Sequence, residues 1–404
     1  MHFERFARLI SFMGKVIKNI HLIRIMSIID KLVKRFDNDN IIKFSDKDAF
    51  KDMKSWAHSG SSELDFNLGT FGFPQGIVEI AGASRGGKTT LALEAMKNFQ
   101  RENKDTAVCV ILSSENRDNK DYARRIGLDV NNVLIVKVTF VEEMFLLVKQ
   151  IIDATMEEFK ASKIKKQPRF MFIWDSLGAT LSLNEKNTMA ENNAMLSKKL
   201  ATGETLSELK NEKIGAFAKE AKKFAKYILS ETYDKIIHFI ILNHTYDTIT
   251  GMGISTKKST GGEWVQYLPT QRLQIASKGM ERLGDEEVAQ ISTVKVIKND
   301  FGSRKKTEIR ILLGEGIILS NNDIEYALER GILKQEGKKK VSYLNGKLSW
   351  STPREFFQLY HDRNKYLDVL AAQIRKSMQK DLLEIKAKYN GESSDVEDDE
   401  EVEE

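Results

Sequence analysis

Hydrophobic and polar residues follow two different patterns along this chain. In the first ~40 residues apolar side chains recur at helix spacing between basic residues. They include Phe6, Leu9, Ile10 and Met13, and then Ile25, Ile28, Ile29 and Leu32. We therefore expect residues 1–55 to form a basic helical arm that packs on a neighbouring subunit. Binding to a membrane surface is the alternative for an amphipathic arm of this kind.

From Ile77 onwards, short β-branched runs alternate with amphipathic helical segments. The predicted strands are Ile77–Ala81, Ala107–Leu112, Val133–Val138, Phe170–Trp174, Ile236–Leu242, Leu273–Ala276, Thr293–Ile297 and Glu308–Leu312. The predicted helices lie near Thr89–Gln100, Val141–Phe159 and Ile214–Ser230. Strands separated by helices predict an α/β fold with a mostly parallel sheet covered on both faces. The later strands have little helix between them, so the sheet should end in an antiparallel section.

A third pattern begins near Asn321. Asp323–Leu333 reads as a helix, and Val341–Trp350 alternates around Asn345-Gly346, the pair favoured in two-residue hairpin turns. Thr352-Pro353 then starts a long helical pattern that runs to about Tyr389. The sequence thus predicts four parts: the arm 1–55, a core 56–320, a small α/β module 321–390 and a disordered acidic tail 391–404.

Composition excludes several classes of protein. No apolar run approaches the ~18 residues that a membrane-spanning helix needs. The single cysteine, Cys109, excludes a disulfide framework and a thiolate zinc site. A reducing compartment, and hence a cytoplasmic protein, is the expectation.

The formal net charge of +5 hides a strong asymmetry. Glu392–Glu404 holds nine acidic residues and no basic one, and without those nine acids the charge of +5 becomes +14. A solubilising tail is one explanation. The sharper hypothesis is a body that binds a polyanion and a tail that competes for the same surface.

A phosphate-binding loop lies between the first predicted strand and the helix after it. The pattern G-x-x-x-x-G-K-[ST] is matched by Gly82, Ala83, Ser84, Arg85, Gly86, Gly87, Lys88 and Thr89, with Thr90 next in the helix. Glycines let backbone N–H groups wrap phosphates at a helix N-terminus. Lys88 should reach the β- and γ-phosphates of ATP, and the Thr89 hydroxyl should hold Mg²⁺. The alternative is a glycine-rich loop with a buried lysine.

Two acidic residues follow predicted strands and are candidates for the chemistry. Asp175 ends the apolar run Phe170–Trp174, and a carboxylate there is costly unless it is used or paired, which makes it the metal-side candidate. Glu115 follows Ala107–Leu112, so it should face the same crevice beside Asp175. From spacing alone, Glu115 fits an activator of water and a solvated loop residue equally well.

These motifs resemble those of the RecA-type recombinases, with the bacteriophage UvsX branch as the nearest likeness. The matching segments are Phe73–Gly82, Glu115, Tyr122–Gly127, Asp175–Gly178 and Leu242–Tyr246. The resemblance covers most of the chain, from about Trp56 to the C-terminal helices. It implies that Glu115 is the general base and that Tyr122 stacks on adenine.

The resemblance also implies two DNA-binding segments. In the family, the residue at the position of His244 senses whether the γ-phosphate is present and transmits this to the following loop, here Thr245–Glu263. Without the resemblance, we would interpret His244 as a core histidine at the end of a strand. The candidate DNA-binding residues in that loop are Met252, Ile254, Lys257, Lys258, Gly261 and Gly262. A second DNA loop is expected within Leu181–Leu196, with Lys186, Lys198 and Lys199 nearby.

One departure concerns the chemistry between subunits. In relatives a neighbouring subunit donates two cations to the ATP site, from a segment that Val296–Asp300 resembles. Lys298 fits the first cation, but Asp300 is an acid where the second should be, and Arg304 or Lys305 could substitute. The phosphate loop also lacks the proline that is usual after its first glycine.

The expected function is ATP-dependent strand exchange by a helical homo-oligomeric filament on single-stranded DNA. Lys338, Lys339 and Lys340 of the C-terminal module would receive duplex DNA, and a single-strand-binding protein and a loader are further expected partners. A ring helicase or clamp-type motor on the same core is the runner-up. A DNA-coating protein without ATP turnover is a third alternative.

Overall fold

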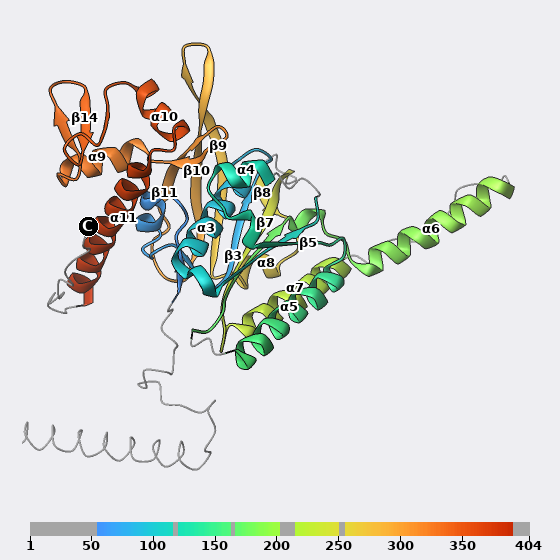
Figure 1. Ribbon diagram of the computed structural model, residues 1–404. Helices are drawn as coiled ribbons and strands as arrows, with labels where there is room; N and C mark the ends of the chain where they lie inside the picture. Colours follow the sequence, from blue (N-terminus) through green and yellow to red (C-terminus); the bar gives the residue numbers. More distant parts are fainter. Residues whose placement is uncertain (1–54, 116–119, 163–165, 203–214, 250–254, 391–404) are drawn as a thin grey trace, which may run out of the picture. The chain divides into compact units, whose positions relative to one another are not determined.

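The computed structural model describes residues 55–115, 120–162, 166–202, 215–249 and 255–390 (Figure 1). Residues 1–54 of the predicted arm and the acidic tail therefore lie outside the described residues, as do Met252 and Ile254. None of the described helices is long and apolar enough to cross a membrane.

Among the described residues, ten strands form one central sheet in the order β12-β11-β10-β9-β3-β7-β6-β4-β5, with β8 paired to β7. Neighbouring strands from β5 to β9 are parallel, whereas β10, β11 and β12 continue antiparallel. This confirms the predicted α/β fold and its antiparallel section. The strands are β3 (Gly76–Gly82), β4 (Ala107–Ser113), β5 (Val133–Lys137), β6 (Arg169–Asp175), β7 (Ile236–Ile249), β8 (Ser255–Ser259), β9 (Gln271–Leu283), β10 (Glu286–Asn299), β11 (Lys306–Leu312) and β12 (Gly316–Ile318).

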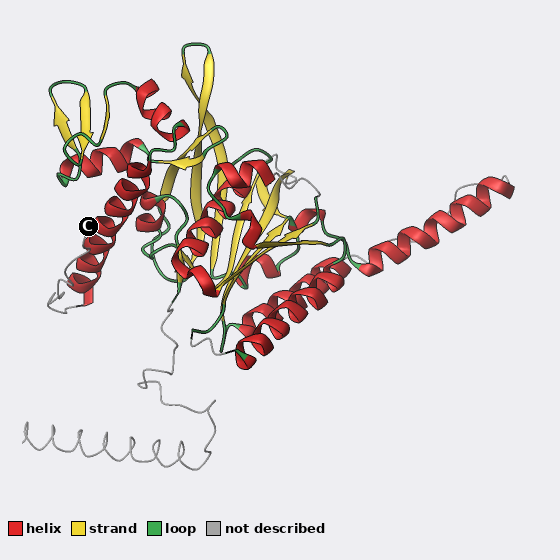
Figure 2. Ribbon diagram, in the orientation of Figure 1, coloured by secondary structure: helices red, strands yellow, loops and turns green. Residues whose placement is uncertain are grey.

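Helices cover both faces of the sheet (Figure 2). On one face lie α3 (Lys88–Asn103), α4 (Lys120–Arg125) and α2 (Ser62–Asn67), and on the other lie α5 (Val141–Ala161), α7 (Ala216–Glu231) and the short α8 (Trp264–Tyr267). Because successive strand residues point to opposite faces, Val78 and Ile80 join the core under α3, while Ile77 joins the core under α5 and α7. This burial on both faces explains why the strand sequences are apolar at nearly every position.

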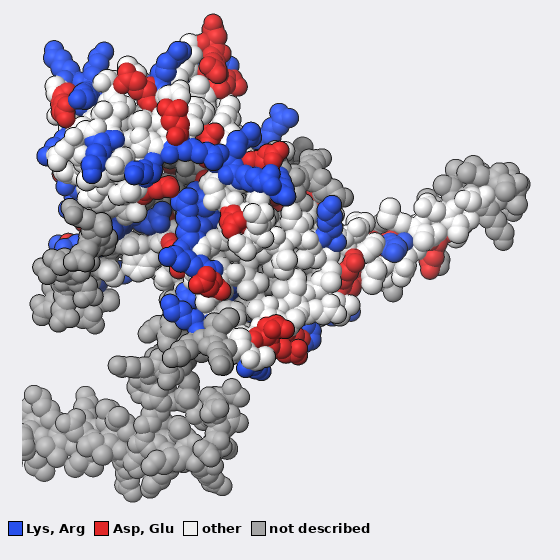
Figure 3. Space-filling view, in the orientation of Figure 1, with Lys and Arg blue, Asp and Glu red and all other residues white. Residues whose placement is uncertain are grey.

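Two regions differ from the sequence-based expectation. The segment expected to hold a DNA loop, Leu181–Leu196, is largely part of helix α6 (Leu183–Thr202), which projects away from the sheet (Figure 1). Its predicted role on DNA stays a prediction, but the loop conformation was wrong. Strands β9 and β10 are also longer than predicted and form an extended hairpin whose tip carries exposed Asp285, Glu286 and Glu287 (Figure 3).

The C-terminal region packs around a third apolar core, to which Trp350, Phe356 and Phe357 contribute and which also includes Ala289 of β10 and Leu312 of β11. Its elements are α9 (Asn321–Glu329), β13 (Lys334–Glu336), β14 (Lys340–Tyr343), β15 (Leu348–Trp350), α10 (Pro353–His361) and α11 (Lys365–Asn390).

Local sequence signals explain most of these C-terminal boundaries. The Thr352 hydroxyl accepts a hydrogen bond from the Glu355 N–H, as the predicted helix start requires. Three predictions were wrong in detail. The first helix ends at Glu329 instead of Leu333, and the long helical pattern is divided between α10 and α11. Residues 344–347 also make a longer turn than the two-residue one expected, with positive φ at Leu344, Asn345 and Gly346.

Candidate nucleotide-binding site

The phosphate loop lies between the end of β3 and the start of α3, as the motif requires. Gly87 has φ +99° and precedes the first helical residue, Lys88. A Cβ atom on Gly82 would lie 2.1 Å from the Ile275 carbonyl oxygen, so a larger residue there would push β9 away. Gly86 donates to the Ala83 carbonyl at 3.3 Å, which closes the loop on itself. Close backbone packing thus favours glycine in this loop, in addition to the predicted binding of phosphates.

Two backbone carbonyl groups of the phosphate loop hold the Lys88 side chain over that loop. Its Nζ atom donates to the Gly82 oxygen at 3.0 Å and to the Ala83 oxygen at 2.8 Å. Burial lowers the pKa of Lys88, and the carboxylates of Asp175 and Glu115 oppose that shift. A cation in this position, at a helix N-terminus, suits the binding of a polyphosphate.

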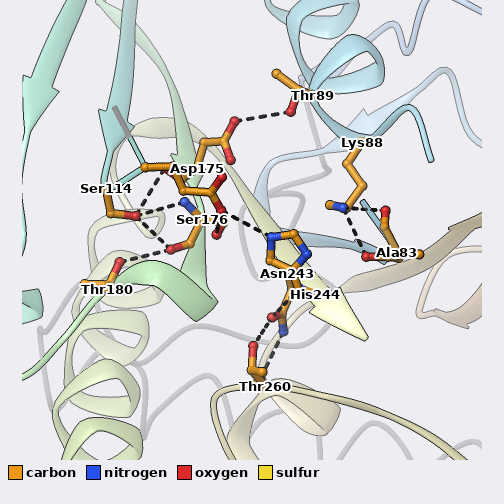
Figure 4. Close-up of polar contacts among 12 residues, drawn as sticks. Ala83, Lys88, Thr89, Ser114, Asp175, Ser176, Thr180, Asn243, His244 and Thr260 are labelled. Carbon is orange, nitrogen blue, oxygen red and sulfur yellow. Dashed lines mark hydrogen bonds and ion pairs between the residues drawn. The ribbon is translucent and has the colours of Figure 1, made fainter. Parts of the chain in front are cut away.

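Thr89 and Asp175 form a candidate site for a divalent cation. The Thr89 Oγ1 atom donates to Asp175 Oδ2 at 3.2 Å, which joins the start of α3 to the end of β6 (Figure 4). A hydroxyl and a carboxylate are hard oxygen donors of the kind that Mg²⁺ prefers beside phosphates. The residues present therefore fit the predicted Mg²⁺, and Thr89 and Asp175 are the two that would hold it.

Glu115, two residues after β4, and His244, within β7 beside the end of β3, meet at the same edge of the sheet. The Glu115 Oε1 atom accepts a hydrogen bond of 2.6 Å from the Ser176 hydroxyl and lies 3.2 Å from His244 Nε2. The Ser114 hydroxyl in turn donates to the Ser176 carbonyl at 2.9 Å. Parallel strands present their C-terminal ends at one edge, so residues far apart in sequence converge here.

A cavity of about 490 Å³ joins these groups. Of the predicted site residues, its lining includes Ser84, Arg85, Lys88, Thr89, Glu115, Tyr122, Asp175 and His244. The Tyr122 hydroxyl and the Thr90 hydroxyl are 2.7 Å apart, so α3 fixes the tilt of the predicted adenine platform. The predicted roles of these residues stay predictions, but the fold brings them to one place.

Lys298 does not join this cavity. Its Nζ atom donates to the carbonyl oxygens of Tyr267 and Pro269, both at 2.8 Å, and forms an ion pair of 3.2 Å with Asp300. These groups lie at the N-terminal end of β9, and β9 runs parallel to β3, so Lys298 is at the opposite end of the sheet from the phosphate loop of its own chain. Lys298 therefore does not line the cavity of its own chain, and its predicted role at the site of another chain stays a prediction.

The predicted DNA loop after His244 is a β-hairpin at its base. Strands β7 and β8 pair antiparallel from Thr245–Ser259 to Ile249–Ser255. Lys257 and Lys258 belong to β8 by their backbone, and their side chains lie outside the described residues. Gly261 and Gly262 follow with φ values of +100° and +91°.

Three residues near the site were not singled out from the sequence. Ser176 donates to Glu115, and Gln290 of β10 donates to the Arg85 carbonyl at 3.0 Å and so supports the phosphate loop. Asn243 is fully buried beside His244. Ser176 and Asn243 do lie within the segments that resemble the family, and this was their signal. Gln290 gave no signal, because its contact joins positions far apart in the chain.

The comparisons with known proteins agree with this site. A sequence model of the RecA N-terminal domain matches residues 23–157. "Protein RecA" of Chlorobaculum parvum is 28% identical over 312 residues, which cover 76% of this chain and 80% of that protein. "Protein RecA" of Chlorobium chlorochromatii is 27% identical over 327 residues, covering 80% and 82%, and that of Bacteroides thetaiotaomicron is 26% identical over 310 residues, covering 76% and 83%. With the sheet and the cavity described above, these similarities support the expected RecA-type recombinase.

Proposed function

We propose that this chain is a DNA-dependent ATPase that assembles on single-stranded DNA, pairs it with a homologous duplex and exchanges the strands. The observation that carries the proposal is one continuous strand, β7. Its residue His244 lies 3.2 Å from Glu115 in the nucleotide cavity, and its next residues begin the hairpin predicted to bind DNA. A change at the γ-phosphate would therefore reach the DNA-binding hairpin through a single strand.

The residues of the cavity divide the work of ATP hydrolysis. Lys88 and the loop N–H groups would hold the phosphates, and Thr89 with Asp175 would hold Mg²⁺. The metal ion would supply positive charge that offsets the charge on the phosphates. Glu115 would accept the proton of the attacking water at a carboxylate oxygen, while the Ser176 hydroxyl keeps that carboxylate oriented. Tyr122 would offer its ring to the adenine.

Several surfaces would contact DNA. The hairpin residues Met252, Ile254, Lys257 and Lys258, followed by Gly261 and Gly262, would follow the backbone of the single strand. Lys338, Lys339 and Lys340 are exposed at the edge of the C-terminal module, where basic side chains gather (Figure 3). They suit the duplex, because binding through phosphates needs cations and little sequence readout. The acidic tail would screen the same surface until Mg²⁺ or DNA displaces it.

The finer points of the proposal rest on the sequence. The likeness to the bacteriophage UvsX branch suggests a viral recombinase that works in the cytoplasm of a host cell. A single-strand-binding protein and a loader are the expected accessory partners. Lys298, with Arg304 or Lys305, would complete the ATP site of the next chain in the filament.

Strand exchange measured against two duplexes tests the function directly. A circular single strand is incubated with ATP, Mg²⁺ and either a homologous or a heterologous linear duplex, and joint molecules are resolved on a gel. We expect products with the homologous duplex alone, and none with Lys88→Ala under the same conditions. Products that form equally with both duplexes, or strand separation without an added single strand, would instead indicate a DNA motor.

A further inference from the structure

A buried polar network lies behind the nucleotide cavity, at the base of the β7–β8 hairpin. Asn243 is 0% exposed and Glu79 is 1% exposed. The Asn243 Nδ2 atom donates to Glu79 Oε1 at 2.8 Å, and the Arg272 Nε atom donates to Glu79 Oε2 at 2.6 Å. Glu79 belongs to β3, the strand that ends in the phosphate loop. The network therefore ties the hairpin to the strand that carries the loop.

The Asn243 side chain also joins the two ends of the hairpin. Its Nδ2 atom donates to the Thr260 carbonyl at 2.9 Å, and its Oδ1 atom accepts from the His244 N–H at 2.8 Å and from the Thr260 hydroxyl. The Thr260 N–H donates to the His244 carbonyl at 3.3 Å. Both residues that flank the paired part of the hairpin are thus bound to one amide group.

An amide is the side chain that this position needs. Asn243 uses both of its N–H groups and both lone pairs of its oxygen, so its hydrogen-bonding capacity is fully satisfied. A carboxylate in its place would lose both donors and would face the Glu79 carboxylate at a distance of about 3 Å in a buried site. An apolar residue would leave Glu79 with one partner fewer.

We propose that Asn243 is a positioning residue, which clamps the base of the hairpin to Glu79 and thereby holds His244 against Glu115. This inference rests on the proposed function, because it assigns the clamp to the coupling between ATP and DNA. Asn243 does not itself line the nucleotide cavity, and it reaches that cavity through His244, whose N–H donates to it. Asn243 acts through its neighbours. When the hydrogen bonds of its side-chain amide are lost, His244 and the hairpin can move independently of the phosphate loop.

The substitution Asn243→Asp tests the clamp with almost no change in shape. A matched control is Asn98→Asp, which also places an acid at a buried asparagine that donates to a backbone carbonyl, that of His58, but far from the hairpin. The first measurement is hydrogen exchange of the Thr260 amide in the full chain without DNA. We expect clearly faster exchange in Asn243→Asp and unchanged exchange in Asn98→Asp.

The second measurement is the coupling between ligands. Affinity for a labelled single strand is measured with and without a non-hydrolysable ATP analogue, and the ratio is the coupling factor. We expect Asn243→Asp to lower that factor about tenfold towards one, within the usual range of coupling between sites. Affinity for the nucleotide in the absence of DNA should stay within about twofold of wild type, because no phosphate or adenine contact is lost.

A double substitution tests the specific pair of side chains. In Glu79→Gln with Asn243→Asp, the amide and the carboxylate exchange places, so one hydrogen bond between the strands can form again and Arg272 keeps an acceptor. The double variant should recover part of the coupling factor that Asn243→Asp loses, a non-additive result expected of directly interacting groups.

The outcomes separate the clamp from the proposed function. A wild-type chain without any effect of nucleotide on DNA affinity contradicts the proposed function, and the exchange experiment then decides the clamp by itself. Unchanged exchange of the Thr260 amide in Asn243→Asp overturns the clamp. So does an equal loss of nucleotide affinity and coupling in Asn243→Asp and Asn98→Asp, since that result means general damage from a buried charge.

Discussion

Glu115 carries the most direct prediction at the scale of a single residue. Glu115→Gln keeps the size of the side chain and an oxygen that can accept from Ser176, but it cannot take a proton from water. ATP turnover on single-stranded DNA should fall by about 10²–10⁴-fold, the contribution typical of a general base. Binding of the nucleotide and of DNA should persist. Phosphate release, compared with that of the exposed-site control Glu143→Gln, measures the effect. Turnover at the wild-type rate would remove Glu115 from the chemistry.

The burial of His238 predicts how the free energy of unfolding depends on pH. Its ring is 1% exposed, with Nδ1 3.1 Å from the Pro74 carbonyl and Nε2 2.9 Å from the Ser55 hydroxyl. Because a carbonyl only accepts, Nδ1 carries the proton, and Nε2 can accept from Ser55. Burial lowers the pKa of His238 to about 4 from an ordinary value of 6.5. The unfolded chain therefore binds the proton first as pH falls, and stability is lost between pH 6.5 and pH 4.

Urea unfolding at two pH values measures this effect. Between pH 7.5 and pH 5, wild type should lose about 2 kcal/mol more than His238→Gln, which cannot titrate. Other groups titrate over the same interval, and the comparison with the variant subtracts them. Parallel losses in both proteins would show that the His238 ring tolerates its second proton in the fold.

The sequence predicted individual residues where the signal is local. The residues from Gly82 to Thr89 form one contiguous motif, so the phosphate loop could be located without the fold. Asp175 was assigned from the cost of an acid after a buried strand. Ser176 and Asn243 lacked an assigned role, because a hydroxyl or an amide acquires a function only from its partner. The partner of Asn243 is Glu79, 164 positions away in the chain.

Among the elements, the turn after the β7–β8 hairpin gives a sharp steric prediction. Gly261 has φ +100°, and a Cβ atom there would lie 2.6 Å from Leu177 Cδ2. Gly284, at the tip of the β9–β10 hairpin, has φ +67° and nothing within 4 Å of such an atom. Both alanine variants carry the backbone cost of positive φ. Gly261→Ala should lose about 1–3 kcal/mol more than Gly284→Ala in urea unfolding, which is the cost of overpacking. Equal losses would mean that Leu177 moves aside freely.

Element types were predicted well where burial imposes a period. Strands β3, β4, β5, β6 and β11 and the helices α3, α5 and α7 match their predicted positions within a few residues, whereas β7, β9 and β10 extend further than predicted. Helix α6 was missed because its sequence is polar and lacks a continuous apolar stripe, and the expectation of a DNA loop came from relatives with a shorter segment there. The β9–β10 hairpin was underestimated, because its outer half has no second layer to bury and so shows little alternation.

For the molecule as a whole, the distribution of charge predicts how the tail acts. Deleting Glu392–Glu404 removes nine acids from a body of net charge +14. Duplex affinity at low Mg²⁺ should rise by about tenfold, and the gain should shrink as salt screens both surfaces. Fluorescence anisotropy with a labelled duplex over a salt series measures it. A chain whose tail acids are replaced by Ser and Gly residues controls for length. Unchanged affinity in both would leave the tail a role in solubility alone.

The order of the strands in the sheet could not be predicted from the sequence. Periodicity indicated a mostly parallel sheet, but not that β3 lies between β7 and β9, with β6, β4 and β5 beyond β7. This order depends on how the faces of whole elements fit together, which no local window contains. It also decides which loops meet at the nucleotide edge. The candidate site could therefore be predicted as a set of residues, while its geometry required the fold.

The position of Lys298 has a consequence for the ends of an assembly. The phosphate loop and Lys298 lie at opposite ends of the sheet. If Lys298 completes the ATP site of the next chain, as proposed, chains stacked end to end would share each ATP between one chain's cavity and the next chain's lysine. At one terminus a cavity then lacks its donor, and at the other a lysine lacks its cavity. Every filament would hold one complete site fewer than it has chains. Turnover per chain would accordingly rise with filament length and vanish for an isolated subunit.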